Sequence, residues 1–590
     1  MTKRKASARR AILVFAHLLA VALLVVAVPY TASAQDPGQQ PVLPDLAPRE
    51  MEIRGELIIQ FPLLERQPLL GFNPPPRIPE IPADRQPLVD DYKQERADLP
   101  QTTIERPDPP TAMGSSAGPV RGEVEAAAGS YLSRLVRVRA GGQVSPSTSI
   151  RASLDYLGSD GSEIVALQRV ENPFDSMDGS VAVDYEGRSM RAGATVGGFA
   201  DYYSLFGLAS RLPAVEPSFE NGPDRTANGV RIAARVASPR GAATSYSMGA
   251  RWSYAGFETT SDSTFSPDER RIDLDAGLSV PAGITSVGVD IRAGTSGLNT
   301  SGFVGSSQQY IDAGLGGSLT RRSGITGSLK VRVLGARYDS PLSLTGEQRK
   351  LLYLSPEVDV VLPIAAGFSL FAGNAPSIEV NSLQDVYRRS PFIAPGASFG
   401  PGLNVVDARA GVRLTFATVV FEPYAAYRWS PNQLYYAANV VTVNEPNGVV
   451  TTRSGRVATI AGGASLSVGL TGSLTAAVTG EYREAELTDL DVPVPYLPTV
   501  ATTGGITWSF LEERALARVQ ARYEGVRHVE ETESRELHAI TSLDLLASFD
   551  ITRNIGLTFR GLNLTDSPLE RWDTYRMTGR QFLGGLRIRW

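Results

Sequence analysis

Cysteine is absent from the 590 residues, and histidine is nearly so, with three in the whole chain. Without cysteine there are no disulfides and no thiolate metal sites. His528 and His538 lie in or beside the acidic stretch 530–536, a composition typical of a solvated loop. A hydrolytic or metal site built on these two histidines is the weaker interpretation. We therefore expect no enzyme activity, no metal and no cofactor.

Long apolar runs are also scarce, and the single one, Ala11 to Val28, stands near the N-terminus. It follows five basic residues and precedes Ala32-Ser33-Ala34, the small-x-small pattern at which signal peptides are cleaved. Residues 1–34 are therefore predicted to be a secretory signal peptide, with a retained N-terminal anchor as the alternative. No later stretch reaches the roughly 20 apolar residues of a helical membrane span.

The charge balance argues against nucleic acid as a partner. Five of the 57 basic residues and none of the 62 acidic residues lie in the predicted signal peptide, so the remaining chain is acidic. Nucleic-acid-binding domains are instead basic, because they neutralise phosphates with lysine and arginine.

Proline is concentrated in one region, residues 35–119, which holds 17 of the 40 prolines. Proline fixes φ and removes a backbone donor, so neither a helix nor a central strand can run through such a region. We expect an extended, Pro-rich periplasmic arm. Its one strand-like piece, Met51 to Phe61, is either part of a simple tether or a docking element. Our hypothesis is that residues 51–82 dock against the mouth or lumen of the domain that follows; inward-folded long loops or a separate protein are the alternative ways to close that lumen.

From residue 120 to residue 590 the sequence alternates between apolar and polar residues. Between Val406 and Phe416 the even-numbered positions are apolar, and the odd-numbered ones are Asp, Arg, Gly, Arg and Thr. A period of two places all apolar side chains on one face of a strand. Segments of about 10–15 residues suit tilted membrane-crossing strands better than stacked soluble sheets. The prediction is all-β: a transmembrane antiparallel β-barrel of about 22 strands (range 18–24) in an outer membrane, with stacked sandwiches as the alternative.

Short and long connections alternate along this region, as they do in barrels with short periplasmic turns and long outer loops. The polar face carries many charges, which suits a wet lumen. Arginines in a pore can select anions, although they also pair with acids on neighbouring strands. The candidate lumen contacts to a solute are Arg231, Arg235, Arg409, Arg413, Arg518 and Arg522. Loop tyrosines such as the pairs 202–203 and 435–436 are further candidate contacts, although such pairs more often belong to an interface girdle than to a binding site.

The C-terminus carries the most specific motif. A strand-like segment runs into a turn, and a Gly-Arg-x-Phe segment then leads into a terminal strand; the turn and glycine residues are Asn563, Leu564, Thr565, Asp566, Gly579 and Arg580. This order resembles the closing region of TonB-dependent receptors. The last strand also resembles the signal read by the barrel-assembly machinery, through Phe582, Leu586, Ile588 and Trp590. An amphipathic strand with a terminal aromatic residue can pair edgewise while its neighbour is missing.

The resemblance implies an outer-membrane transport barrel that binds or passes a small solute. The sequence departs from the family at the front, because residues 35–119 are too short and too proline-rich for the mixed α/β plug domain that the family carries in its lumen. The alternative is a plugless structural barrel whose arm and long outer loops dock partner proteins. Expected partners are outer-membrane lipid, the barrel-assembly machinery, and either a TonB-type energising protein or a separate plug protein.

Overall fold

The computed structural model describes residues 121–161, 173–205, 224–259, 266–283, 285–299, 305–320, 325–339, 348–394, 400–438, 450–531, 535–567, 569–573, 575–577 and 579–590. The predicted signal peptide and the Pro-rich arm, including residues 51–82, lie outside these residues. Among the described residues, no helix is long and apolar enough to cross a membrane.

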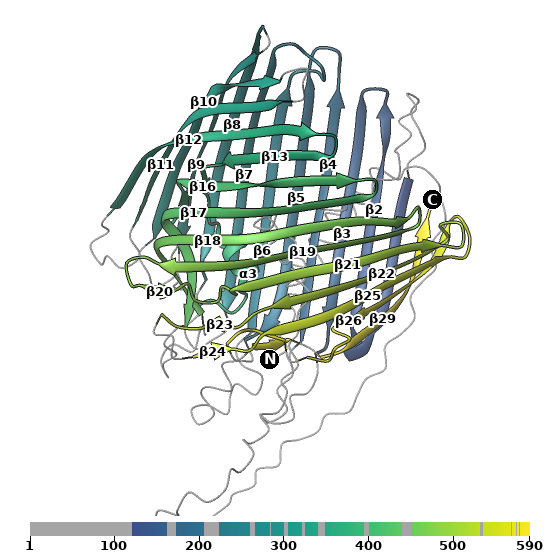
Figure 1. Ribbon diagram of the computed structural model, residues 1–590. Coiled ribbons are helices and arrows are strands. Elements are labelled where there is room, and N and C mark those ends of the chain that lie inside the picture. Colours follow the sequence, from purple (N-terminus) through teal and green to yellow (C-terminus); the bar gives the residue numbers. More distant parts are fainter. Residues whose placement is uncertain are drawn as a thin grey trace, which may run out of the picture.

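The described strands form one closed antiparallel β-barrel (Figure 1). Its 22 strands, in order around the wall, are β1 (Arg121–Gly129), β2 (Arg134–Ser145), β3 (Thr148–Ser159), β4 (Phe174–Glu186), β5 (Arg191–Ser204), β6 (Asp224–Ala237), β7 (Ser245–Thr259), β8 (Asp268–Ala282), β9 (Thr285–Asn299), β10 (Ser306–Thr320), β11 (Thr326–Asp339), β12 (Gln348–Ala365), β13 (Phe368–Asn374), β16 (Val406–Phe416), β17 (Val419–Ala438), β18 (Val450–Thr471), β19 (Leu474–Leu487), β21 (Val500–Phe510), β22 (Ala515–Glu524), β25 (Ile540–Asp550), β26 (Ile555–Leu562) and β29 (Gln581–Arg589). The predicted fold class and strand number are confirmed.

The barrel closes where the first strand meets the last. β1 pairs with β29 from Glu123 opposite Arg589 to Gly129 opposite Leu583. Glu125 on β1 also reaches past β29, and both of its carboxylate oxygens accept hydrogen bonds from Arg560 Nη2 on β26, at 2.7 and 2.9 Å. Closure leaves no sheet edge, so every backbone group of a wall strand can pair inside the membrane.

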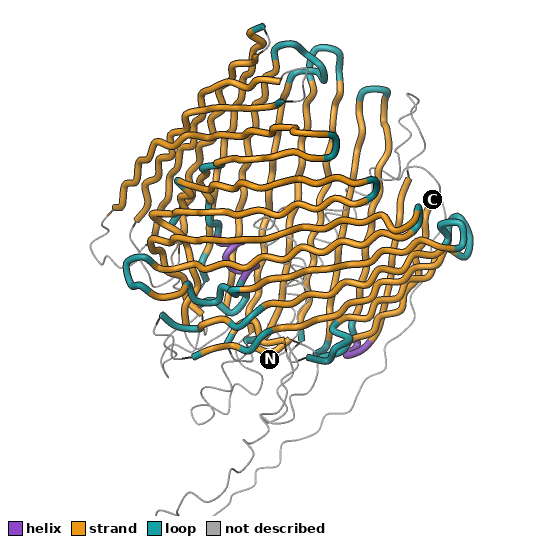
Figure 2. The backbone as a smooth tube through the Cα atoms, in the orientation of Figure 1, coloured by secondary structure: helices purple, strands orange, loops and turns teal. Residues whose placement is uncertain are grey.

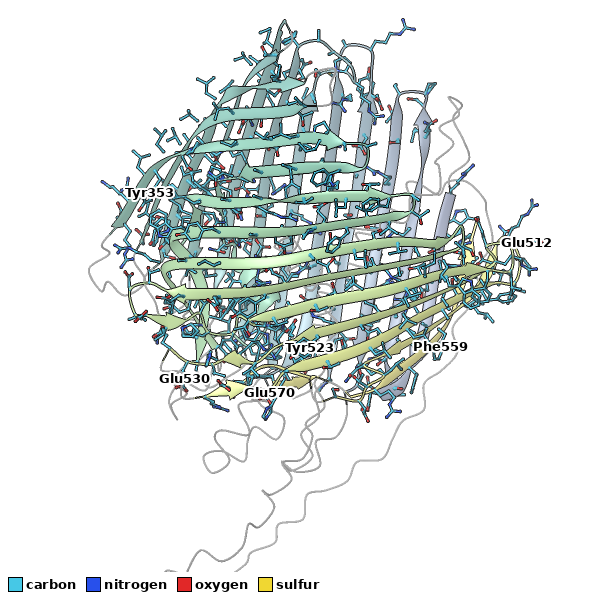
Figure 3. All side chains as sticks on the ribbon, in the orientation of Figure 1. Tyr353, Glu512, Tyr523, Glu530, Phe559 and Glu570 are labelled. Atoms are coloured by element: carbon cyan, nitrogen blue, oxygen red, sulfur yellow. The ribbon has the colours of Figure 1, made fainter. Side chains whose placement is uncertain are left out.

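The alternating sequence places apolar side chains outward on the barrel wall. On β6, Val230 and Ile232 face out, and on β12 Leu352 and Leu354 do, with 74% and 69% of their surface exposed. Tyr523 on β22 and Phe559 on β26 belong to the same outer surface (Figure 3). Because such a surface is stable only against hydrocarbon, the barrel is built to span a membrane.

The two ends of the barrel differ (Figure 2). At the turn end, which holds both Arg121 and Trp590, the strands are joined by short turns such as 146–147, 366–367 and 472–473. At the loop end the connections are longer and carry the minor elements η1 (Ser130–Leu132), β14 (Ser377–Glu379), α3 (Leu383–Arg389), β15 (Gly402–Asn404), β20 (Val492–Pro493), β23 (Arg527–His528), β24 (Glu536–Leu537), β27 (Leu569–Trp572) and β28 (Tyr575–Met577). In Figure 3, Glu512 lies at the turn end, and Glu530 and Glu570 lie at the loop end.

Candidate functional site

One connection at the loop end turns into the lumen instead of extending away from the barrel. Residues 381–394, here called the lumen segment, lie between β13 and β16 and contain α3. The short helix forms because Ser382 caps it: the Ser382 hydroxyl accepts a hydrogen bond from the Asp385 amide at 3.0 Å. Asp385 in the first turn and Arg388 and Arg389 in the last turn also match the helix dipole.

The apolar side of the lumen segment packs against the inner wall. Its side chains Leu383, Val386 and Tyr387 are fully buried. They form one cluster with inward-facing side chains of several strands, namely Phe199, Ala227, Ala255, Phe257 and Leu298. The Tyr387 and Phe257 rings lie 4.1 Å apart between centroids. Burial raises the pKa of the Tyr387 hydroxyl above its ordinary value.

An ion cluster ties the helix to the opposite wall. Arg388 Nη2 donates to Asp178 Oδ2 on β4 at 3.0 Å, and the Arg388 guanidinium lies 4.8 Å from the centre of the Phe199 ring. The same Asp178 carboxylate accepts from Arg231 on β6 at 3.0 Å. β4 is nine strands away from β13 in the ring of 22, so the lumen segment spans the lumen rather than following the wall beside it.

Backbone groups of the lumen segment are also held by side chains of the wall. Glu269 on β8 accepts from the Leu383 amide at 2.6 Å. The Pro391 carbonyl accepts from two buried donors, Arg225 Nη1 at 2.6 Å and Tyr203 Oη at 3.0 Å. A buried carbonyl with two donors is costly to detach, because water must replace both hydrogen bonds.

The end of the lumen segment joins the outer loops. The Phe392 ring stacks on Tyr575 of β28 at 3.4 Å, and Ile393 forms a parallel bridge with Val450 at the start of β18. Phe392, Val450 and Tyr575 belong to a buried cluster with Phe174, Tyr203, Leu205 and Trp572. The described loops therefore meet in an apolar layer across the loop end of the barrel.

The structure places the six predicted arginines inside the barrel, in pairs on three separate strands, β6, β16 and β22. Arg231 takes part in the Asp178 cluster, and Arg235 pairs with Asp184 at 3.3 Å. Arg409 and Arg413 both pair with the buried Glu422, at 3.5 and 2.8 Å. Arg522 pairs with Glu524, whereas Arg518 is exposed and no ion pair to it is found among the described residues. No ligand contact of these side chains is tested by the structure, so that role stays a prediction.

Two tyrosines that the sequence assigned to an interface girdle face the lumen instead. Tyr203 is buried and donates to Pro391, and Tyr436 Oη donates to the Val386 carbonyl at 3.4 Å. In a pair of adjacent residues on a strand only one can face outward, and an apolar lumen segment gives the inward one a dry environment. In the sequence, the only signal that a tyrosine would face the lumen was the presence of two neighbouring aromatic residues near a strand end.

The C-terminal motif folds as one turn. Asn563 and Asp566 both have positive φ, 47° and 54°. Asp566 Oδ1 accepts from the Arg580 amide at 2.9 Å, and Oδ2 lies 3.2 Å from Arg580 Nη2. Thr565 Oγ1 donates to Asn563 Oδ1 at 3.0 Å, and the Leu564 amide donates to Leu543 O at 2.7 Å. A Cβ at residue 579 would meet Asp566 Oδ1 at 2.7 Å, which accounts for glycine there.

The predicted assembly residues occupy a single surface. Phe582, Leu586, Ile588 and Trp590 are all exposed on the outer face of β29, at 42–52%. Arg587 and Arg589, between them in sequence, face inward and pair with Asp550 at 2.6 and 3.0 Å. This amphipathic arrangement is what the assembly role requires, and the role itself stays a prediction.

His528 and His538 lie at the loop end, in or beside the β23–β24 hairpin. His528 Nδ1 lies 3.6 Å from Glu536, in the β23–β24 hairpin. Within the described residues, no group of histidine, aspartate and glutamate could hold a metal ion.

Comparison with solved structures identifies the fold class. No family model matches the sequence, and no curated protein matches it either. Solved structures match across the barrel: it has the fold of TonB-dependent receptors, as the C-terminal motif predicted. The siderophore receptor PirA from Acinetobacter baumannii has a TM-score of 0.62 at 11% identity, covering 80% of this chain and 81% of that one. The copper transporter OprC has a TM-score of 0.61 at 12% identity, with the same coverage. The ferric enterobactin receptor PfeA from Pseudomonas aeruginosa has a TM-score of 0.59 at 10% identity, covering 80% and 82%.

The plug domain expected of that fold is not evident among the described residues. In that part of the chain, the lumen is entered by the segment 381–394, which belongs to the barrel itself.

Proposed function

We propose that the protein is a transport barrel of the outer membrane, in which the lumen segment 381–394 closes the lumen at rest. The observation that carries this proposal is a set of contacts between the lumen segment and wall strands far from β13 and β16. The wall residues in these contacts are Asp178, Glu269 and Arg225. A barrel of 22 strands encloses a lumen wide enough to leak, so it needs a closure. A segment held by ion pairs and hydrogen bonds can close it and still open.

The orientation follows from the connections. Short turns face the periplasm and long loops face outward in bacterial barrels. The turn end, with Arg121 and Trp590, is then periplasmic, and the Pro-rich arm extends into the periplasm. There it meets a TonB-type energising protein or a separate plug protein. PirA is a siderophore receptor, OprC a copper transporter and PfeA a ferric enterobactin receptor, and these similar proteins support a small solute as cargo.

The test is solute entry into proteoliposomes. One sample carries the intact protein, and a second carries a variant in which residues 382–394 are replaced by a short Gly-Ser linker. We expect the variant to admit small sugars that the intact protein largely excludes. Vesicles without protein, and heat-modifiable migration of both proteins on gels, control for leakage and folding.

An equal and low permeability of both proteins would contradict the proposal. That result would favour the alternative, a closed barrel whose loops and arm dock partner proteins.

A further inference from the structure

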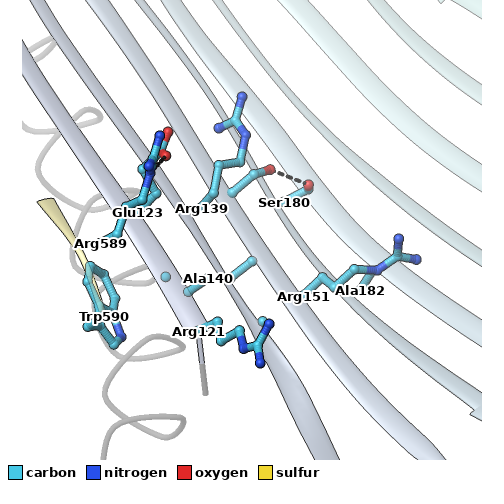
Figure 4. A pocket seen from close by; sticks show the side chains of 13 residues that line it. Arg121, Glu123, Arg139, Ala140, Arg151, Ser180, Ala182, Arg589 and Trp590 are labelled. Atoms are coloured by element: carbon cyan, nitrogen blue, oxygen red, sulfur yellow. Dashed lines mark hydrogen bonds and ion pairs between the residues drawn. The ribbon is translucent and has the colours of Figure 1, made fainter. Parts of the chain in front are cut away.

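A hollow of about 690 Å³ lies on the inner wall at the turn end, over β29, β1, β2, β3 and β4 (Figure 4). Four arginines line it, one from each of four strands: Arg121, Arg139, Arg151 and Arg589. Among the described residues that line it, Glu123 is the only carboxylate, and it pairs with Arg589 at 2.9 Å. The lumen segment packs at the opposite end of these strands, so the hollow is a separate feature.

Beside the hollow, one carboxylate forms ion pairs with two guanidinium groups. Asp155 on β3 lies 3.3 Å from Arg137 Nε and 2.8 Å from Arg139 Nη2. The Arg139 side chain is half exposed, and its Nη1 also donates to the Val138 and Leu154 carbonyls at 3.2 and 3.4 Å. Asp155 is therefore shared by two guanidinium groups.

The neighbouring strand repeats this arrangement. Asp184 on β4 lies 2.5 Å from Arg151 Nη2 and 3.3 Å from Arg235 Nη2. Both arginine side chains are largely exposed, at 67% and 74%. Arg121 adds a further positive charge, and no ion pair to it is found among the described residues. Several exposed guanidinium groups therefore line a part of the wall on which the described arginines outnumber the described acids.

We propose that this hollow is a binding site for soluble solutes that carry phosphate groups. Guanidinium forks match the oxygens of phosphate, and a phosphate group can accept hydrogen bonds from several of them at once. The volume is within the range of small-molecule sites. The site faces water rather than lipid, because Val183 and Tyr185, which alternate with Ala182 and Asp184, point outward. The inference rests on the proposed transport function: solutes that carry phosphate groups would be the class of solute that the barrel transports.

The test is titration of the purified full-length protein in detergent with inorganic pyrophosphate, by calorimetry at low ionic strength. We compare the wild type with R139Q/R151Q. The matched control is R188Q/R240Q, which removes the same charge from exposed arginines in turns at the same end of the barrel. We expect the site variant to bind at least about tenfold more weakly, since it loses two charge-assisted contacts, and the control to bind as the wild type does.

Equal affinity of the two double variants would overturn the proposal, as would the absence of pyrophosphate binding to the wild type. Heat-modifiable migration shows beforehand that each variant is folded. The outcome is independent of the permeability test. Pyrophosphate binding in a barrel that passes no solute would refute the transport function alone, and solute passage without pyrophosphate binding would refute this site alone.

Discussion

Asp178→Asn removes the charge that holds the lumen segment to the far wall. In the intact protein the Asp178 carboxylate accepts from Arg388 of α3 and from Arg231 of β6, both at 3.0 Å. A hydrogen bond to a charged group contributes about 1.5–3 kcal/mol. The Asp178 and Arg388 side chains are 34% and 24% exposed, so solvent screening reduces this to about 1–2 kcal/mol. Because 1.4 kcal/mol is a factor of ten, the ratio of open to closed states should rise roughly 5- to 30-fold.

Single-channel recording in planar bilayers measures this ratio as the frequency of openings. The matched control is Asp184→Asn on the same strand, which changes the same charge but whose partners, Arg151 and Arg235, do not contact the lumen segment in any described interaction. We expect frequent openings in the Asp178 variant and wild-type behaviour in the control. If the two variants open equally often, the reasoning about the Asp178 cluster is wrong.

Three further predictions concern closure and assembly of the barrel. Glu125→Gln should lower the temperature at which the barrel unfolds in detergent more than Glu123→Gln does, since the Glu125 side chain is 7% exposed and Glu123 39%; removing a partner of a buried pair costs about 3–5 kcal/mol. Arg580 holds the pKa of the Asp566 carboxyl below its usual value, so the turn is stabilised above about pH 4 and loses that contribution as pH falls through the lowered pKa. Hydrogen exchange at Arg580, corrected for intrinsic rates, should show this loss in the wild type and not in Asp566→Asn. Removal of Arg589 and Trp590 should slow membrane insertion, and normal outer-membrane levels of that variant would contradict the assembly role.

The wall of the barrel could be predicted from the sequence because its signal is local. Alternation between Val406 and Phe416 determines which side chains of that strand face lipid, and this does not depend on contacts with strands distant in sequence. The expected alternation of short and long connections is also present, with short turns at 472–473 and 551–554. The terminal turn was also recognisable, since Asp566 and Arg580 are only 14 residues apart.

The lumen segment could not be predicted, because its contacts are remote in sequence. Arg388 and Asp178 are 210 residues apart, and Tyr203 and Pro391 are 188 apart. Its helix has seven residues, about two turns, which is too short for a hydrophobic period to be distinctive. The six arginines could not be distinguished in the sequence either, because their partners are also remote. In the structure, Arg231 pairs with Asp178 beside the lumen segment, whereas Arg235 pairs with Asp184 beside the hollow.

The central claim, that the lumen segment opens and closes the barrel, can be tested most directly by locking it. Ile393 and Val450 bridge the segment to β18, and paired strand residues lie within disulfide range. The chain has no cysteine, so I393C/V450C introduces the only pair, with I393C alone as the control. Single-channel recordings of the oxidised protein should show no openings, and reduction should restore them. Openings of the same frequency and conductance before and after reduction, with the disulfide verified, would contradict the account.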